Sequence, residues 1–304
     1  MDRDRIKQSL ASPVPSIRIP FDAEGNIDFA ALSAMVEFDI GAGSQALVLT
    51  AGDSLYPLLT EAEISQVTKS VVEYARGRAV VAACTGWWNT RKCVEFARYC
   101  REVGVDILMT LASNWYPDCL SVPTMVEHFA EVARHIPVMA NTACLHYPGK
   151  VAGLAVARRL VKEVDNIIAA KCDVQGEFDR KIVLLAKDKW TLFAGGSKQF
   201  HLELHPYGCQ GHMSTFITFK PEIAQRYWKA IRQNNLGAAA EIIERYDYPF
   251  FNFILSLPGG FDAGIHGVYE LFGLARRWRR KPFVSLADAD LLKLKDFLVE
   301  RQIL

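Results

Sequence analysis

One repeating pattern constrains the fold of this chain more than any other feature: a short apolar run is followed by a longer stretch with the hydrophobic spacing of a helix. Eight runs have the length and composition of strands, at residues 14–19, 45–50, 79–84, 106–111, 136–140, 166–171, 190–194 and 207–213. Amphipathic stretches lie between most of them, at residues 28–42, 60–76, 90–103, 122–134, 150–163 and 176–187. Parallel strands that alternate with helices close into a barrel through right-handed crossovers, so the pattern predicts an α/β fold, the (β/α)8 TIM barrel.

The last part of the chain has a different pattern, because the strand signals stop after about residue 218. Helical stretches follow at residues 220–234, 237–255, 263–278 and 285–302. We therefore predict a barrel over residues 1–222 and a C-terminal helical region over residues 223–304. A doubly wound sheet is the alternative fold for alternating strands and helices, but no GxGxxG phosphate-binding motif follows a predicted strand.

Charge and cysteine content narrow the possible partners. The 35 basic and 34 acidic residues nearly cancel, so there is no overall electrostatic signature for nucleic acid or an anionic membrane, and we expect a small-molecule partner. The seven cysteines are scattered, without the spacing of a zinc site, so no metal is expected. The N-terminus lacks a signal peptide and no apolar run approaches about 18 residues, which predicts a cytoplasmic protein.

Lys171 is the main candidate for chemistry, because it ends the apolar run 166–171. Reacting groups of (β/α)8 barrels lie at the C-terminal ends of the strands. Partial burial there favours the neutral amine, which is the form that condenses with a ketone. The alternative is that Lys171 marks the end of the strand and extends to solvent.

Several motifs occur in an order that resembles the dihydrodipicolinate synthase and N-acetylneuraminate lyase family. The segment 169–173 with Gly176 resembles the family's sixth-strand motif around its Schiff-base lysine. Residues 19–21 with Gly25 and Asp28, residues 59–63, residues 104–106 and residues 208–214 resemble other family motifs in the same order. The resemblance implies that Lys171 forms an imine with a pyruvate-like α-keto acid, without a cofactor, in a homo-oligomer (dimer or tetramer).

The chain departs from the family at two catalytic motifs. Where the family presents a proton-relay tyrosine on the fifth strand, this sequence has Asn141 or Ala140, and neither is a phenolic acid or base. Tyr147 lies six residues further on and is a possible substitute, although an aromatic residue before a proline is also typical of loop packing. Asn141 and Tyr147 are thus the candidates for catalytic roles beside Lys171. The residues that bind the keto-acid carboxylate in the family are replaced by 50–54, with Gly52, Asp53 and Ser54 as candidate substrate contacts.

Other candidate pocket residues follow the remaining strands. We predict substrate contacts from Asn114, Trp115, Gly195 and Met213. Trp87 and Trp88 either form a wall of the pocket or pack at a subunit interface. The spacing of His201 and His205 suits a metal on a helix, but a hydrogen-bonded structural role is favoured. The basic cluster 276–281 is interpreted as a solvated helix end.

These observations favour a Schiff-base-forming lyase or aldolase whose acceptor is unknown. A sugar-acid dehydratase that acts on a 2-keto-3-deoxy acid would use the same imine. A barrel that binds keto acids without catalysis is the alternative from another class, and the missing tyrosine supports it.

Overall fold

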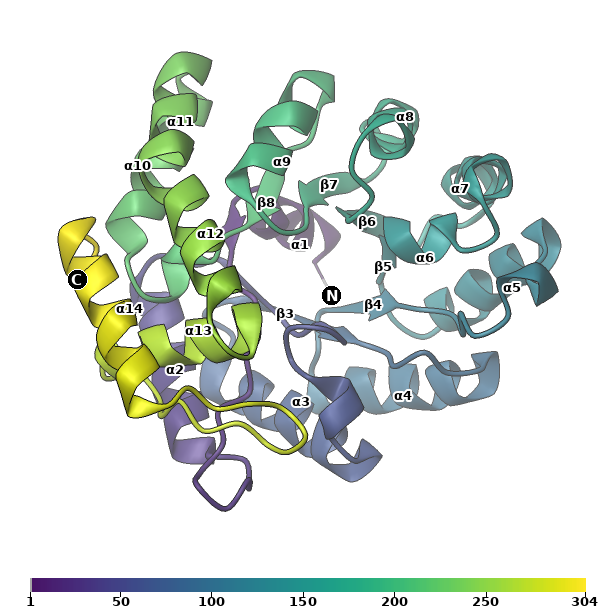
Figure 1. Ribbon diagram of the computed structural model, residues 1–304. Helices are drawn as coiled ribbons and strands as arrows, with labels where there is room; N and C mark the ends of the chain where they lie inside the picture. Colours follow the sequence, from purple (N-terminus) through teal and green to yellow (C-terminus); the bar gives the residue numbers. More distant parts are fainter. Residues whose placement is uncertain (1) are drawn as a thin grey trace.

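The computed structural model describes residues 2–304, and its eight strands are all parallel (Figure 1). They are β1 (Pro13–Val14), β2 (Ala46–Val48), β3 (Val80–Cys84), β4 (Ile107–Thr110), β5 (Val138–Asn141), β6 (Ile167–Cys172), β7 (Thr191–Ala194) and β8 (Gly211–Met213). From β2 to β8 each strand pairs with the next one in sequence, and β8 pairs with β1. A parallel bridge between Ser16 and Val48 joins the β1 and β2 segments, which closes the ring. The predicted (β/α)8 barrel is therefore confirmed.

Helices follow the strands around the outside of the barrel, near the predicted positions (Figure 1). They are α2 (Phe29–Gly41), α3 (Glu61–Ala75), α4 (Thr90–Val103), α5 (Val122–Ala133), α7 (Lys150–Glu163), α8 (Glu177–Ala186) and α10 (Pro221–Arg232). Short helices α6 (Thr142–His146) and α9 (Lys198–Leu204) come after β5 and β7. The capping box at the start of α3 is present, since the Thr60 hydroxyl accepts the Glu63 N–H and the Glu63 carboxylate accepts the Thr60 N–H.

The N-terminal helix α1 (Arg3–Leu10) was not predicted. It packs against β2, β3, β6 and β7, and Lys7 donates a hydrogen bond to the Lys189 carbonyl just before β7 begins. Ile6 and Leu10 are buried. This helix therefore covers the end of the barrel at which the strands start.

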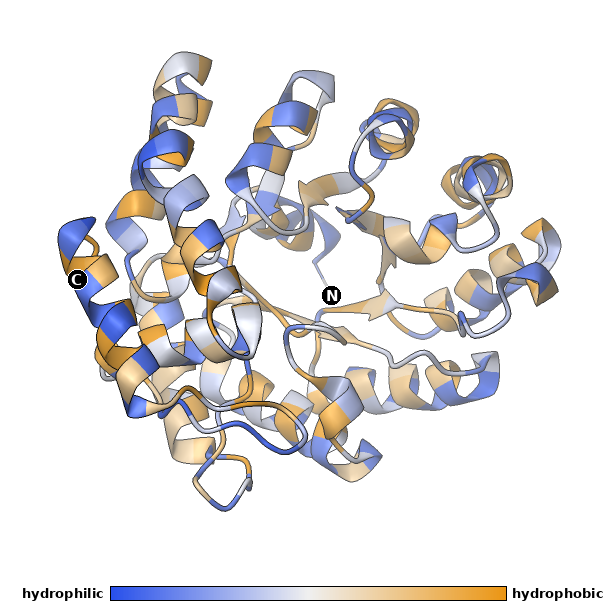
Figure 2. Ribbon diagram, in the orientation of Figure 1, coloured by the Kyte–Doolittle hydropathy of each residue, from blue (hydrophilic) through white to orange (hydrophobic). Residues whose placement is uncertain are grey.

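Burial explains why the strands are almost wholly apolar. All residues of β3 and β4 are buried, because the barrel interior covers one face of each strand and a helix covers the other. Figure 2 shows this distribution, with hydrophobic residues concentrated in the strands and polar residues on the outer faces of the helices. No helix within residues 2–304 has the length and apolar character needed to cross a membrane.

The C-terminal helices pack beside α10 and α2 on one side of the barrel (Figure 1). They are α11 (Leu236–Ile242), α12 (Tyr248–Ser256), α13 (Gly260–Leu271) and α14 (Asp288–Glu300). The predicted helix 237–255 is interrupted by a π-helical turn, Ile243–Asp247. The predicted helix 263–278 ends at Leu271, close to Gly273, which has a φ of +72° that favours glycine.

Two further expectations were wrong. The predicted strand 207–213 is shorter, because His205–Tyr207 form a 3₁₀ turn and Pro206 has no N–H to donate to a ladder. The basic cluster 276–281 is not a solvated helix end. Arg279 is buried and donates to Asp262 (2.7 Å) and to the Ile19 carbonyl (3.1 Å).

The next arginine of the cluster has a similar role. Arg280 donates to the Glu63 carboxylate at 2.7 and 2.9 Å and to the carbonyl groups of Gly25 and Leu58 at 2.8 Å each. The hydrogen bonds from Arg280 to the Glu63 carboxylate are the largest cause that lowers the pKa of Glu63 to about 2. The cluster therefore attaches the C-terminal region to the barrel.

Candidate active site

The candidate site is a cavity of about 530 Å³ at the ends of the strands where barrel enzymes carry their reacting groups. Every strand or the loop that follows it contributes to the wall, and Phe251 of α12 and Phe261 of α13 complete it. Polar lining residues include Ser16, Arg18, Thr50, Asp53, Asn141, Lys171, Asp173, Gln175, Ser197, Ser214 and Thr215.

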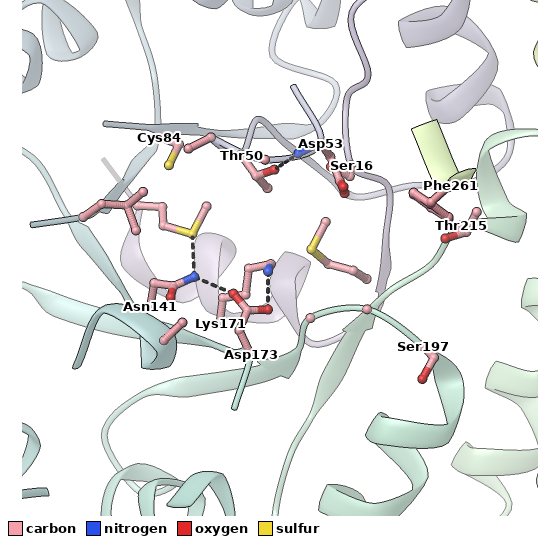
Figure 3. A pocket seen from close by; sticks show the side chains of 18 of the residues that line it. Ser16, Thr50, Asp53, Cys84, Asn141, Lys171, Asp173, Ser197, Thr215 and Phe261 are labelled. Atoms are coloured by element: carbon pink, nitrogen blue, oxygen red, sulfur yellow. Dashed lines mark hydrogen bonds and ion pairs between the residues drawn. The ribbon is translucent and has the colours of Figure 1, made fainter. Parts of the chain in front are cut away.

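Lys171, the predicted catalytic lysine, lies near the end of β6 and lines this cavity. Its Nζ forms an ion pair with Asp173 Oδ1, and the two side chains are only 12% and 22% exposed. Figure 3 shows the amine and the carboxylate side by side, with Asn141 on the other side of the carboxylate. Residues two apart on a strand share a face, which explains why Asp173 follows Lys171 into the cavity.

Asn141 is paired in register with Lys171 across β5 and β6. Its Nδ2 donates to Asp173 Oδ2 at 2.5 Å, and its Oδ1 accepts the Cys144 N–H at 3.1 Å as the N-cap of α6. The Thr142 hydroxyl accepts the Asp173 N–H at 2.7 Å. The aspartate is thus held at its backbone and at one carboxylate oxygen, and its other oxygen contacts the lysine.

Gly195 gives this ion pair its space. A Cβ added to Gly195 would collide with Asp173 Oδ1 and with Lys171 Nζ. Gly195 was predicted as a substrate contact, and it does line the cavity, as does Met213. The close approach of the ion pair is an additional physical reason for a glycine at this position.

The loop after β2 contains a second carboxylate, Asp53, which is paired with Arg18 at 3.2 Å. Burial raises the pKa of Asp53, but opposing effects, of which the positive charge of Arg18 is the largest, outweigh this and hold the pKa below its ordinary value. The pairing with Arg18 offsets the repulsion that Asp53 alone would exert on a substrate carboxylate. Gly52 and Asp53, both predicted as substrate contacts, line the cavity.

Three predicted substrate contacts are not at the cavity. Ser54 is completely buried, because its hydroxyl donates to the Ile17 carbonyl at 2.6 Å and accepts the Thr50 N–H at 3.0 Å. Asn114 and Trp115 lie on the exposed loop after β4, where the Trp115 side chain is 81% exposed and stacks edge-on with Tyr116. The Ser54 side chain is therefore directed into the packed loop, away from the cavity, whereas the Trp115 side chain lies on the surface.

The two neighbouring tryptophans have separate surroundings. Trp87 lines the cavity and donates a hydrogen bond from Nε1 to the Tyr147 hydroxyl at 3.1 Å. Burial raises the pKa of Tyr147. Trp88 instead packs edge-on against Phe96, and the Lys92 amine lies 4.6 Å from its ring centre. Only Trp87 of this pair is therefore a wall of the pocket.

The Cys84 thiol and the His201 imidazole are two further side chains of the region that could carry chemistry. Burial raises the pKa of the Cys84 thiol, at the end of β3, to about 12, so this cysteine is not a thiolate nucleophile at neutral pH. His201 is buried, its Nδ1 hydrogen-bonds with the Tyr227 hydroxyl at 2.8 Å and its ring stacks on His212. No cluster of three His, Cys, Asp or Glu side chains within residues 2–304 is arranged to hold a metal ion.

The sequence analysis missed Arg18 and Asp173 as site residues. Arg18 interrupts the apolar run 14–19, which is the kind of signal that drew attention to Lys171. Asp173 stands two residues after Lys171, so the strand period alone was enough to place both on one face. The contributions of Phe251 and Phe261 had no local signal.

The fold and the site together define a (β/α)8-barrel protein with a partly buried amine, that of Lys171, near the end of its sixth strand. The chain belongs to the Dihydrodipicolinate synthetase family, whose pattern matches residues 10–301.

The chain is also similar to individual relatives in sequence and to a solved structure in fold. The chain is 27% identical over 284 residues to a 4-hydroxy-tetrahydrodipicolinate synthase from Chlorobaculum parvum, which covers 91% of this chain and 92% of the relative. It is 25% identical over 305 residues to a Streptomyces avermitilis protein named "Probable 5-dehydro-4-deoxyglucarate dehydratase 2". That alignment covers 97% of this chain and 88% of the relative. A prophage protein of the dihydrodipicolinic acid synthase family from E. coli K12, in complex with pyruvate, has a similar fold (TM-score 0.82, 19% identity, 96% and 99% coverage).

Proposed function

We propose that this protein is a class I aldolase-type lyase that forms an imine between Lys171 and a pyruvate-like α-keto acid. One observation carries the proposal: the Lys171 amine lines the main cavity at the end of β6, in contact with a carboxylate that can exchange a proton with it. Membership in the Dihydrodipicolinate synthetase family supports it. A protonated imine accepts the electron pair released when a bond next to it breaks, so no cofactor is required.

Substrate binding is assigned to the walls around this amine. The backbone at Gly52 and Gly195 permits close approach of a small ligand. The Arg18–Asp53 pair and Met213 border the same space. A keto acid with its carbonyl carbon at Lys171 would therefore contact both polar and apolar walls.

A sugar-acid dehydratase is the second candidate, and it would use the same imine to expel a hydroxyl group. Five serine and threonine side chains line the cavity beside Tyr147, and their hydroxyl groups suit a polyhydroxylated acid: Ser16, Thr50, Ser197, Ser214 and Thr215. The name of the Streptomyces avermitilis relative points in the same direction.

The first experiment is chemical trapping of the imine. The protein is incubated with pyruvate and sodium borohydride and analysed by peptide mass spectrometry, beside Lys171→Ala and the matched variant Lys229→Ala, which removes an exposed lysine of α10. We expect an adduct on Lys171 in the parent and in Lys229→Ala, and none at this site in Lys171→Ala.

The two activities and the non-catalytic alternative predict different results. Release of water from a 2-keto-3-deoxy sugar acid would select the dehydratase, whereas carbon–carbon cleavage or condensation would select the aldolase. Binding of keto acids without an adduct would refute the imine and leave a binding protein.

We further propose that the protein is a cytoplasmic homo-oligomer, as the family resemblance implies. All seven cysteines are free, which suits a reducing compartment. Light scattering of the purified protein measures its mass in solution, and a mass of about 34 kDa, that of one chain, would refute the oligomer.

A further inference from the structure

An enzyme that works through an imine must move protons at the reacting nitrogen and at the neighbouring carbon. The position that faces Lys171 from β5 is Asn141, and a carboxamide has no group that serves as a general acid or base at neutral pH. We propose that Asp173 is the general acid and base of this site. The inference rests on the imine proposed above and adds a catalytic residue to it.

The geometry supports Asp173 because its carboxylate contacts the reacting nitrogen directly. Oδ1 pairs with Lys171 Nζ, while Oδ2 accepts the hydrogen bond from Asn141. The backbone N–H of Asp173 is held by the Thr142 hydroxyl. One oxygen is thus anchored and the other is aimed at the amine, as Figure 3 shows. Asn141 is accordingly a positioning residue in this scheme.

The other titratable groups near the cavity have different partners. The Tyr147 hydroxyl accepts a hydrogen bond from Trp87. Asp53 pairs with Arg18, and the Cys84 thiol donates to the Thr85 carbonyl at 3.1 Å. Within residues 2–304, Asp173 is the side chain that makes a hydrogen bond to Lys171 Nζ.

His146 lies at the end of α6 and packs edge-on against Phe178 of α8, with ring centres 4.8 Å apart. It is not among the residues that line the cavity. Proton transfer at the imine is therefore assigned to the carboxylate that already contacts the amine.

The proton sequence balances without any other reactant. A proton first moves from Lys171 Nζ to Asp173 Oδ1, which leaves a neutral amine and a carboxylic acid. The amine lone pair attacks the keto carbon, and the proton that the new C–N centre loses ends on the former carbonyl oxygen, which gives a neutral carbinolamine. Asp173 then protonates that hydroxyl, the C–O bond breaks, water leaves and the nitrogen lone pair forms the protonated imine.

The regenerated Asp173 carboxylate performs the next step. It removes a proton from the carbon beside the imine, the C–H electron pair forms a C=C bond and the C=N electron pair returns to nitrogen. The product is an enamine, which takes up a proton at the same carbon when the step reverses. In heavy water this reversal exchanges the methyl hydrogens of pyruvate for deuterium, so the step is measurable even though the acceptor is unknown.

The experiment compares the parent protein with Asp173→Asn and with Asp188→Asn, a matched change of an exposed aspartate after α8. Two quantities are measured with pyruvate: the borohydride adduct on Lys171 and the rate of deuterium exchange by NMR. We expect Asp173→Asn to lower the exchange rate by about 10²- to 10⁴-fold, and Asp188→Asn to leave it within about twofold. Asp173→Glu should recover part of the exchange.

The two measurements together separate catalysis by Asp173 from a mere effect on the charge of the lysine. Over a long incubation solvent can carry the protons needed to form the imine, so the adduct of Asp173→Asn should return while deuterium exchange stays low. Return of both to the parent level would overturn the proposal, as would parent-level exchange in Asp173→Asn together with loss of exchange in Tyr147→Phe. A parent protein without adduct or exchange would refute the imine itself, and this inference with it.

Discussion

Asp179, in the first turn of α8, offers a direct test of how burial shifts ionisation in this protein. The residue is completely buried, and its Oδ2 accepts the Val174 N–H at 2.8 Å. Burial raises the pKa of Asp179 from 3.8 to about 7, although hydrogen bonds from Thr142 and Val174 oppose the shift. The folded protein therefore prefers the protonated acid, whereas the unfolded chain ionises near pH 4.

The sign and the size of the effect follow from this difference. Between pH 4 and pH 7 the folded state binds more protons at this site than the unfolded state, so the contribution of Asp179 to stability falls as pH rises. The difference between 3.8 and about 7 corresponds to about 4 kcal/mol in total. About 2–3 kcal/mol of this loss falls between pH 5 and pH 8, because ionisation of the unfolded chain is almost complete at pH 5.

The substitution Asp179→Asn removes the ionisation and keeps an oxygen for the Val174 N–H. The free energy of unfolding is measured by urea denaturation at several pH values for the parent, for Asp179→Asn and for Asp296→Asn, an exposed control on α14. We expect Asp179→Asn to gain about 2–3 kcal/mol relative to the parent between pH 5 and pH 8, and the control to stay level. If the difference in free energy of unfolding between the parent and Asp179→Asn stays constant across this pH range, the pKa of the buried Asp179 carboxyl is not raised.

Three further substitutions test other contacts. Lys198→Met leaves the buried Asp247 carboxylate without its partner (2.8 Å to both oxygens) and should cost about 3–5 kcal/mol in urea unfolding, most of it recovered when Asp247→Leu is added. Arg279→Met breaks the pair with Asp262 and should make the C-terminal region more susceptible to limited proteolysis, so unchanged cleavage would contradict its anchoring role. Gly195→Ala places a methyl group into the ion pair of the cavity and should reduce the borohydride adduct at least tenfold; a full yield would contradict this packing.

The barrel and the position of its candidate lysine could be predicted from the sequence because both depend on local patterns. Periods of two and of 3.6 residues distinguish strands from helices over a few turns of chain. The position of Lys171 at a strand end follows from the same reading, and so does the shared face of Asp173. The family motifs added their order along the chain.

Other features depended on contacts between distant segments. Arg280 pairs with Glu63, 217 residues away in the chain. The basic cluster therefore connects the C-terminal region to the barrel, although its local composition indicated a solvated helix end. The Ser54 side chain points away from the cavity because its hydroxyl donates a hydrogen bond to the Ile17 carbonyl, 37 residues earlier in the chain.

Local sequence patterns determined which elements form and where a charged side chain meets a strand end, since both are governed by neighbours within one or two turns. The hydrogen-bond and ion-pair partners of the buried polar groups depend on the tertiary structure. It paired Asp53 with Arg18, anchored Asp173 through Asn141 and brought Phe261 over the site. Burial favours a hydrogen-bonded partner for a polar group wherever that partner lies in the chain, and only the closed barrel brings the two groups together.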